Sequence, residues 1–326
     1  MTKRLSRRTL LSAAAAFSIV PASVVRAQAY PDKPIKLIVP FPPGGPIDTM
    51  ARLAGKFITD GVGQQVVVEN RPGAGSTLGS KAAAASPPDG YTLLFGSSGS
   101  LAVAPSLYVN AGVDPAKMFS PIASFALLPH IMVVSDAVPS KTLVEFVAHA
   151  KANPGKLSYG AGLGTPPHLL STLFKIKAGI DVTYVPYQGA AQSVIDLVAG
   201  RNHYTIDGTV ILMPQVRAGK LRAIAPARSE RWPELPDVPT LVESGFPDFT
   251  LDAWTGVVAP LGTPEPILAK LNAAINSGLR SAEAKAALDR FSSIAKIGTP
   301  AEFGTFVADQ GRRWGELVKL AGAKVE

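Results

Sequence analysis

The most constraining feature of this sequence is a regular alternation of short apolar segments and amphipathic segments that begins after residue 30. Ile35–Val39, Gln65–Val68 and Tyr91–Phe95 are short runs rich in apolar and β-branched residues. Between them, the apolar residues of Met50–Phe57 recur at helical spacing, and Ser76–Ala85 is a run of small residues that suits a helix. Strands that are almost continuously apolar and alternate with helices are typical of a parallel sheet covered on both faces. We therefore expect an α/β fold.

The same alternation returns in the middle of the chain, and the C-terminal stretch is expected to be mostly helical. Strands are expected at Ile131–Val134, Lys156–Tyr159, Asp181–Val185 and Leu221–Ala225. Near the C-terminus, Thr299–Glu302 has the pattern of a capping box at a helix start. The chain has 326 residues, which is enough for two domains of about 100–200 residues. Two consecutive α/β segments and a helical tail predict two lobes rather than one sheet.

The composition excludes several classes of protein. Of all residues, 47% are hydrophobic and 17% are charged, a balance that excludes an intrinsically disordered chain. The sequence contains no cysteine. It therefore has no disulfide, no thiolate nucleophile, no cysteine-ligated zinc, no iron–sulfur cluster and no lipid-modified N-terminal cysteine.

The N-terminus has the three-part pattern of a secretory signal peptide. Met1–Arg8 is basic, Leu10–Val20 is apolar but too short to cross a bilayer, and Val25–Ala29 contains two A-x-A-like ends. Residues 1–29 are therefore expected to be a cleaved leader that delivers the protein to the periplasm. Ser6–Leu11 also resembles a twin-arginine signal, and both the Tat and the Sec export routes stay open.

The net charge of +8 does not indicate a nucleic-acid partner. Five of the 32 basic residues and none of the 24 acidic residues lie in the first 29 positions. The charges of the remaining chain are nearly balanced and are scattered rather than gathered in a stripe. We therefore expect no nucleic-acid binding.

Four loops at the ends of expected strands are rich in Gly, Ser or Thr, and none of them contains Lys or Arg. They are Pro42–Asp48, Gly73–Thr77, Gly96–Ser100 and Gly160–Thr165. Glycine lets a ligand approach the backbone closely, and the first turn of a helix offers unpaired N–H groups. Such loops suit an anion, above all a carboxylate. A single loop of this kind is better explained as a tight strand-to-helix turn, and only the recurrence of such loops in both lobes makes the two explanations equal.

Two titratable residues lie in the first turns of expected helices. Asp48 would stabilise the helix dipole or hold the ligand-facing turn. His168 would cap and pack, or donate a hydrogen bond to a ligand. The other histidines lack the spacing of metal ligands, so no metal site and no cofactor is expected.

Enzyme motifs are mostly missing. Gly96–Ser100 reads Gly-Ser-Ser-Gly-Ser and nearly matches the G-x-S-x-G nucleophile elbow, but its last residue is serine. There is no P-loop lysine motif. The alternative to a binding protein is a periplasmic α/β hydrolase that uses Ser76, Ser97 or Ser98, because the members of a catalytic triad can be distant in sequence.

A series of short motifs in order resembles the Bug (TctC-like) family, the periplasmic substrate-binding proteins of tripartite tricarboxylate transporters. The resemblance covers essentially the whole chain after the leader. Its motifs are Ile38–Gly45 with Asp48, Ala51 and Arg52, then Val68–Gly75, Pro88–Leu93, Ala152–Leu157, Val185–Gly189, Ala218–Ala223 and Leu235–Thr240.

The resemblance implies a non-enzymatic receptor with a two-lobed periplasmic-binding-protein fold of the Venus flytrap, type II-like kind. It implies a small carboxylate held between the lobes by backbone N–H groups, hydroxyls and waters. The implied partners are the membrane subunits of such a transporter or a sensor protein, and the receptor is expected to be a monomer. The implied ligand-binding residues are Pro43, Gly44, Gly45, Asp48, Gly75, Ser76, Ser97, Ser98, Gly162, Thr165, His168, Tyr187, Gln188 and Asp207.

Two departures from the family pattern lie in the second lobe. The family often has lysine where this chain has Gln188, and a Gly-Gln-Val-Asp-like run where this chain reads Gly200–His203. Loss of a lysine would weaken a second anionic site. This difference favours a monocarboxylate, an amide or an aromatic acid over citrate.

The expected organisation assigns residues 30–127 and 255–326 to one lobe and residues 128–254 to the other. The chain must then cross between the lobes at least twice. We expect these crossings near Phe125–Ile131 and near Phe249–Leu261.

Overall fold

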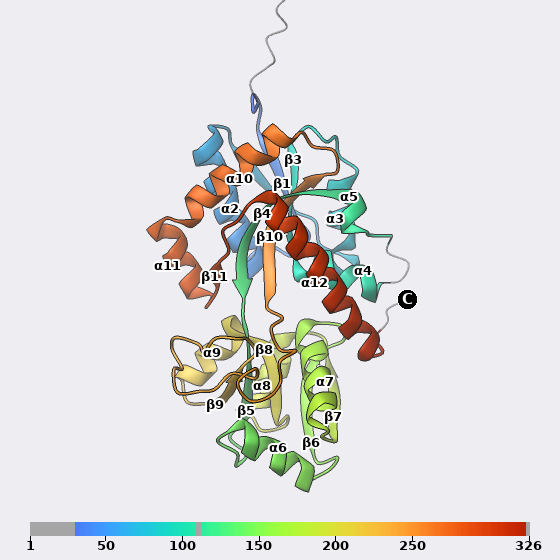
Figure 1. Cartoon of the computed structure of the whole chain (residues 1–326), viewed down its shortest axis with the longest axis vertical. Coiled ribbons are helices and arrows are strands. Elements are labelled where there is room, and N and C mark those ends of the chain that lie inside the picture. Colours follow the sequence, from blue (N-terminus) through green and yellow to red (C-terminus); the bar gives the residue numbers. More distant parts are fainter. Residues whose placement is uncertain (1–29, 109–111, 324–326) are drawn as a thin grey trace, which may run out of the picture.

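The computed structural model describes residues 30–108 and 112–323. In these ranges the strands form two sheets, a six-stranded one in the order β11-β4-β10-β3-β1-β2 and a five-stranded one in the order β7-β6-β8-β5-β9. Figure 1 shows the sheets in two halves of an elongated molecule, which we call lobe 1 (the six-stranded sheet and its helices) and lobe 2 (the five-stranded sheet and its helices). The strands of lobe 1 are β1 (Ile35–Val39), β2 (Val66–Asn70), β3 (Thr92–Ser97), β4 (Phe119–Leu128), β10 (Ala253–Pro260) and β11 (Ile294–Ala295). The strands of lobe 2 are β5 (His130–Ser135), β6 (Leu157–Gly162), β7 (Val182–Tyr187), β8 (Tyr204–Gly208) and β9 (Leu221–Pro226). The expected α/β fold with two lobes is confirmed.

Helices cover both faces of the lobe 1 sheet. Leu37 and Val39 of β1 belong to one buried apolar cluster with residues of α2 and α10. Ile38, which points to the opposite face, belongs to a second cluster with residues of α3 and α12. Every residue of β1 except the exposed Lys36 is buried, because helices cover both faces of the sheet, and these buried residues are apolar. The helical segments of lobe 1 are α2 (Pro46–Val62), η1 (Ala74–Ser76), α3 (Thr77–Ala84), the π-helix η2 (Gly99–Val103), α4 (Ala104–Leu107), α5 (Pro115–Met118), α10 (Glu265–Leu279), α11 (Ala282–Arg290) and α12 (Pro300–Leu320).

The sheet of lobe 1 is mixed, and the expectation of a parallel sheet holds only for part of it. β1 pairs in parallel with β2 and with β3, as the sequence predicts. β10 runs antiparallel to both β3 and β4, and β11 runs antiparallel to β4. The reason lies in the path of the chain, which leaves the lobe along β4 and returns along β10, so that these strands run in opposite directions. The sequence pattern did not predict β4, β8 or β10.

Lobe 2 has the same three-layer construction. Ile131 and Val133 of β5 pack in one cluster with apolar residues of α8 and α9. Met132 and Val134 pack on the other side with residues of α6 and α7. β6 is parallel to β7 and to β8, whereas β5 is antiparallel to β8 and β9. The helices of lobe 2 are α6 (Leu143–Ala152), α7 (Pro166–Ala178), α8 (Ala190–Val198) and α9 (Thr209–Arg217).

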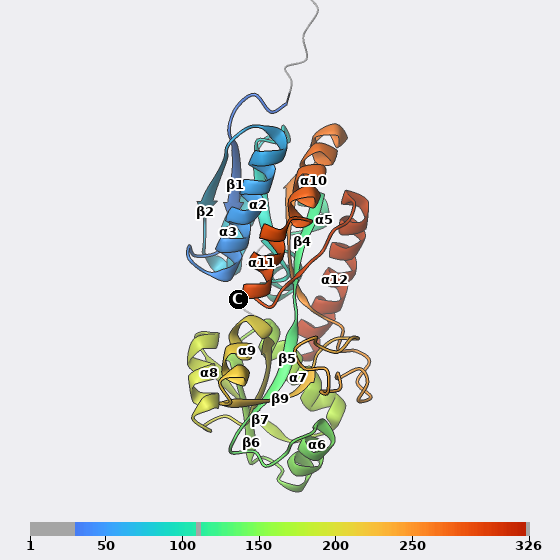
Figure 2. The same cartoon turned by 90° about the vertical axis from the view of Figure 1, so that its left-hand side faces the viewer.

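The chain passes between the sheets at two places. β4 ends at Leu128 in lobe 1 and β5 begins at His130 in lobe 2, and the return runs from Pro226 to Ala253. Both passages lie close to the expected crossings, while the assignment of every residue to a lobe stays a prediction. A third connection is noncovalent, because α12 packs on β4 and also contacts α7 of lobe 2. Figure 2 shows α12 descending along lobe 1 to the level of α7.

The expected leader, residues 1–29, lies outside the described residues. Within the described ranges, no helix has both the length and the apolar character that a membrane-spanning segment requires.

Candidate functional site

The strand topology brings the predicted loops of each lobe to one sheet edge. In lobe 1, β1, β2 and β3 are adjacent and parallel, so the segments that follow them, Pro43–Asp48, Gly75–Ser76 and Ser97–Ser98, leave the sheet at the same edge. The loops are in contact, since the side-chain amide of Asn70 donates to the carbonyl of Phe41 at 3.1 Å. The topology therefore brings the lobe 1 loops together, and the binding role of their residues stays a prediction.

Asp48 organises the loop between β1 and α2. Asp48 is buried, with 3% of the residue exposed. Its carboxylate accepts hydrogen bonds from the Gly44 N–H at 2.9 Å and from Nδ2 of Asn70 at 2.9 Å. It also accepts hydrogen bonds from Nε and Nη2 of Arg52, at 3.0 and 3.1 Å. Burial raises the pKa of Asp48, but the hydrogen bonds from Arg52, Gly44 and Asn70 outweigh burial and lower this pKa below its usual value. Because its oxygens are occupied by protein donors, Asp48 fits the role of holding the turn. Arg52 and Asn70 belong to this group and were not among the predicted site residues.

Glycines let the same loop take a tight path. Gly44 has a φ of +83°, which favours glycine, whereas Gly45 has an ordinary extended conformation as the residue before α2. A Cβ at Gly45 would meet only the Pro42 carbonyl oxygen, at 3.9 Å. Pro43 and Gly44 are exposed. The backbone just before the first turn of α2 is therefore accessible to a ligand.

The segment from Gly73 to Ser76 is a left-handed turn. Its four residues have φ values of +129°, +45°, +60° and +75°, and two of them, Ala74 and Ser76, are not glycine. Left-handed backbone at non-glycine residues is strained, and such strain gathers at functional sites. The turn is held by hydrogen bonds from Thr77 Oγ1 to the Ala74 carbonyl at 2.8 Å and from the Ser76 hydroxyl to the Gly75 carbonyl.

The serines after β3 are engaged with one another. The Ser97 N–H donates to Ser100 Oγ at 2.9 Å, and the Ser100 hydroxyl donates to the Ser97 carbonyl at 3.2 Å. Ser98 is 2% exposed and precedes η2, so this loop opens a π-helix rather than an ordinary α-helix. Among the described residues, no hydrogen bond links Ser76, Ser97 or Ser98 to a histidine, so the geometry does not support a Ser–His pair for the hydrolase alternative.

In lobe 2, an imidazole holds the loop between β6 and α7. The Gly164 N–H donates to Nδ1 of His168 at 3.2 Å, and Thr165 Oγ1 donates to the Gly162 carbonyl at 2.7 Å. The His168 ring packs on Tyr184 with 4.3 Å between ring centroids. Burial lowers the pKa of His168, which favours the neutral imidazole that can accept the Gly164 hydrogen bond.

The loop after β7 lies beside the loop after β6. Gly162 and Tyr187 are register partners, so the two loops leave the sheet together. The Tyr187 hydroxyl donates to Asp196 at 2.7 Å and accepts from Asn202 Nδ2 at 2.8 Å, which directs it toward the C-terminal end of α8. Gln188 is exposed.

Asp207 is partly buried at the carboxyl end of β8, on the same edge as these loops. Its carboxylate accepts a hydrogen bond from the Gly208 N–H at 2.6 Å. Burial raises the pKa of Asp207 to about 7, against the opposing effect of that hydrogen bond. Near neutral pH this side chain can therefore either donate or accept a hydrogen bond.

The loops of the two lobes approach each other at the end of α4. Leu107 lies so close to Gly164 that a Cβ on this glycine would overlap Leu107 Cδ2. The ring of the next residue, Tyr108, lies equally close to Gly75. No sequence signal singled out Tyr108, because it follows a short helix that the periodicity does not predict.

No metal site accompanies these loops. Within the described ranges, no group of three or more His, Asp or Glu side chains is arranged to hold a metal ion.

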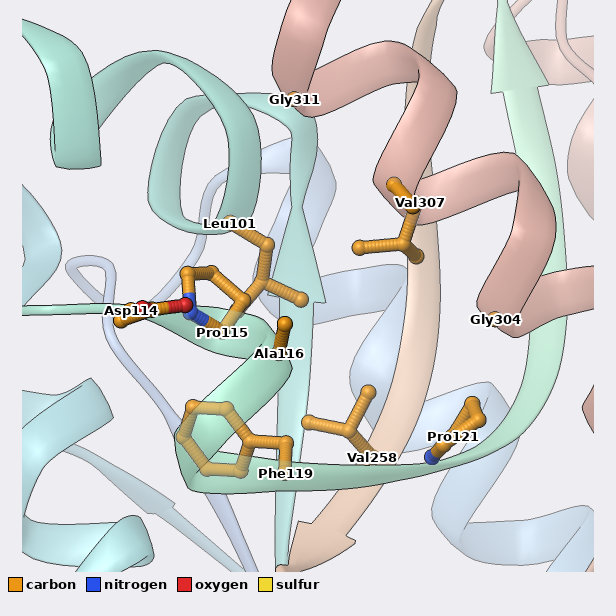
Figure 3. Close-up of a pocket in the computed structure, with 11 residues that line it drawn as sticks. Leu101, Asp114, Pro115, Ala116, Phe119, Pro121, Val258, Gly304, Val307 and Gly311 are labelled. Carbon is orange, nitrogen blue, oxygen red and sulfur yellow. The ribbon is translucent and has the colours of Figure 1, made fainter.

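An apolar pocket of about 400 Å³ lies elsewhere on lobe 1, between α12, β4 and α5 (Figure 3). Of the described residues that line it, only Asp114 is charged. A carboxylate there would meet a like charge and apolar side chains, so this pocket does not suit the ligand that the loops predict. None of the fourteen predicted residues lines it. Its lining is Leu101, Asp114, Pro115, Ala116, Phe119, Pro121, Val258, Gly304, Val307, Ala308 and Gly311.

Comparison with known proteins shows relatives over most of the chain. The model of the tripartite tricarboxylate transporter family receptor matches residues 50–323. Protein BugT of Bordetella pertussis is 37% identical over 307 residues, which cover 94% of this chain and 94% of BugT. The structure of R. palustris Rpa4515 with adipate has a TM-score of 0.78 and 34% identity, and covers 91% of this chain and 100% of that protein. MatC from Rhodopseudomonas palustris with bound malate has a TM-score of 0.74 and 35% identity, and covers 89% of this chain and 100% of MatC.

Proposed function

Because this chain belongs to the tripartite tricarboxylate transporter receptor family, a family of periplasmic solute-binding proteins, we propose that it captures a small carboxylate between its two lobes. The resemblance read from the sequence motifs is thereby confirmed. The relatives solved with adipate and with malate have carboxylates as ligands, which supports the same class for this chain.

One observation carries the proposal. Each lobe gathers glycine- and hydroxyl-rich loops at the carboxyl ends of parallel strands, and the loops lead into helix N-termini. Open α/β sheets bind ligands at this edge, where unpaired N–H groups attract an anion. None of the four loops first identified contains Lys or Arg, so neutral donors would bind the carboxylate.

The proposed ligand site keeps all fourteen predicted residues but divides them by role. Asp48, His168 and Tyr187 would act as positioning residues, since their side chains bind neighbouring loop backbone or helix ends. The others would face the ligand through backbone or side chain. They are Pro43, Gly44, Gly45, Gly75, Ser76, Ser97, Ser98, Gly162, Thr165, Gln188 and Asp207.

Capture would close the two lobes about the passages near residue 129 and between Pro226 and Ala253. A ligand shifts such an equilibrium only if it gains contacts in the closed state. A carboxylate that meets loops of both lobes at once would gain them. The closed receptor would then be presented as a monomer to the membrane subunits of a tripartite tricarboxylate-type transporter or to a sensor protein.

We propose further that the receptor is not an enzyme and that it reaches the periplasm through cleavage of residues 1–29. Intact-mass analysis of exported protein should give a chain that begins between Gln28 and Tyr30. A mass that retains Met1–Arg26 would contradict the cleavage.

Isothermal titration calorimetry against a carboxylate panel that includes adipate and malate tests the function. We expect stoichiometric binding by at least one acid and a higher Tm in its presence, because a ligand that binds only the folded state stabilises it. NMR of the recovered acid should show it unchanged. A panel without a ligand would contradict the receptor proposal, and turnover of an ester or amide would favour the hydrolase.

A further inference from the structure

Two consecutive residues at the end of α4 reach the candidate loops of both lobes. The side chain of Leu107, which is 4% exposed, fills the space beside Gly164 of lobe 2. The end of the Tyr108 ring fills the space beside Gly75 of lobe 1, where Cε2, Cζ and Oη would overlap a Cβ on this glycine. Only glycine leaves room for these contacts. Tyr108 therefore lies where the loop after β2 comes near the loop after β6.

Candidate loops of both lobes also carry apolar side chains. Phe41, in the loop after β1, is partly buried, and its ring edge lies 3.9 Å from the Cβ position of Gly99. Leu163, between two glycines in the loop after β6, is 50% exposed. Backbone N–H groups can hold a carboxylate without the side chains of Tyr108, Phe41 and Leu163. These side chains supply apolar surface at the same sheet edges that supply the donors.

We propose that Tyr108 is a specificity-determining residue that forms an apolar wall of the ligand site and selects carboxylates with an apolar body. This inference rests on the proposed function and narrows it. A ligand with a carboxylate at one end and an aliphatic chain or ring behind it satisfies both the N–H donors and the wall. A ligand whose carbon chain carries hydroxyls would lose the water bound to those hydroxyls, and the face of the Tyr108 ring would offer them no hydrogen-bond partner in return.

Matched acids separate the two classes. Succinate and tartrate share one carbon chain, and so do adipate and galactarate, but the second member of each pair carries hydroxyls on the carbons between the carboxylates. In at least one pair, calorimetry on the full mature chain should give a Kd for the apolar acid that is lower than that of its hydroxylated partner by a factor of about ten or more. Contacts with an apolar pocket change affinity by a factor of ~10–200. An equal or lower Kd for the hydroxylated members would overturn the proposal.

Variants at position 108 assign the selectivity to the ring. Tyr108→Ala should raise the Kd of the preferred acid about tenfold and leave the Kd of its hydroxylated partner within a factor of about two. Tyr108→Phe should keep the selectivity, because it keeps the ring. Val144→Ala, at a site on α6 that is 76% exposed, is the matched control and should change neither Kd. Unchanged selectivity in Tyr108→Ala would overturn the assignment.

A double-mutant cycle tests the contact between Tyr108 and Gly75. Gly75→Ala should displace the ring and weaken binding of the preferred acid, and the same change in a Tyr108→Ala background should have no further effect. Additive effects would contradict a role for this contact. If Tyr108→Ala does not fold, Tyr108→Leu, which keeps apolar surface, should preserve the preference for the apolar acid, and a reversed preference would overturn the proposal.

The outcomes distinguish this inference from the proposed function. If none of the four acids nor malate binds, the receptor proposal fails and takes this inference with it. If tartrate or galactarate binds best and Tyr108→Ala changes nothing, the inference fails while the receptor proposal stands.

Discussion

In lobe 1 a carboxylate holds the loop that opens α2, whereas in lobe 2 an imidazole holds the loop that opens α7. Asp48 accepts hydrogen bonds from the backbone of its own loop, from Arg52 and from Asn70. His168 accepts one backbone N–H and packs on Tyr184. The two solutions serve the same purpose, which is to fix a glycine turn before a helix N-terminus. The first depends on charge, and the second depends on packing.

The acidic groups of the two lobes also respond to pH in opposite directions. The pKa of Asp48 is lowered, so its contribution to stability is present above its unfolded value and is lost as pH falls through the lowered pKa. The pKa of Asp207 is raised to about 7, so its contribution favours folding at low pH and is lost as pH rises through about 7. Lobe 1 is therefore weakened by acid at Asp48, and lobe 2 is weakened by base at Asp207.

The largest expected effect comes from removing the carboxylate that holds the lobe 1 loop. Asp48→Ala should lower the free energy of unfolding by about 2–3 kcal/mol, because charged hydrogen bonds are lost and their donors are left without a partner. Urea unfolding measures this change. Asp60→Ala, at another aspartate of α2 whose pair with Lys56 is exposed, is the control and should cost less than about 0.5 kcal/mol. Equal losses would show that charge does not organise lobe 1.

The next effect tests whether the lobe 1 loop binds ligand through its backbone. Gly45→Val should raise the Kd of the preferred carboxylate at least about tenfold, equal to about 1.4 kcal/mol, and change Tm little. The fold tolerates a side chain there, since Gly45 has extended backbone and no close neighbour. Gly311→Val on α12, where no heavy atom lies within 4 Å of the Cβ position, is the control. An unchanged Kd in folded Gly45→Val would remove this turn from the site.

A smaller effect concerns a contact that joins the lobes. The Thr209 hydroxyl, at the start of α9, is placed to donate to the carbonyls of Pro129 at 3.2 Å and Ser292 at 3.0 Å. Thr209→Val should cost about 1 kcal/mol of unfolding free energy, because it leaves a buried carbonyl without this donor. Thr305→Val, where the lost bond is an exposed one within α12, should cost less. The reverse order would mean that the contact between lobes contributes nothing.

The smallest expected effect is the pH dependence of ligand binding, which tests the role of Asp207 in lobe 2. In the wild type, the Kd of a carboxylate should rise about threefold between pH 6 and pH 8 as Asp207 ionises near an anion. Asp207→Asn should make the Kd independent of pH in this range, and its stability relative to the wild type should improve as pH rises. Calorimetry and thermal unfolding at several pH values measure both. A pH dependence that survives in Asp207→Asn would assign it to another group.

The comparison also shows where sequence reasoning succeeds. The sequence pattern predicted β1, β2 and β3 and the capping box of Thr299 with Glu302. These features could be predicted because the apolar pattern of a strand and the residues of a helix cap are close together in the sequence. The pattern did not predict β4, whose serines and Pro121 interrupt the apolar pattern. β4 and β10 stabilise each other as long antiparallel partners, and such pairing depends on residues more than a hundred positions apart.

The candidate site follows the same division. Its loops could be predicted because glycines and hydroxyls mark the ends of strands. The roles of the side chains could not, because they depend on contacts between distant segments. Asn70 joins the Asp48 group from the neighbouring strand, and Tyr108 reaches Gly75 from a short helix further along the chain.

The apolar interior also sets how the molecule unfolds. A single buried cluster runs from Ile38 and Leu107 of lobe 1 through Trp314 and Leu317 of α12 to Leu170 of α7 in lobe 2. Neither lobe can melt without exposing part of this cluster to water. The two lobes should therefore denature together in one cooperative transition, despite the different ways in which each holds its loops.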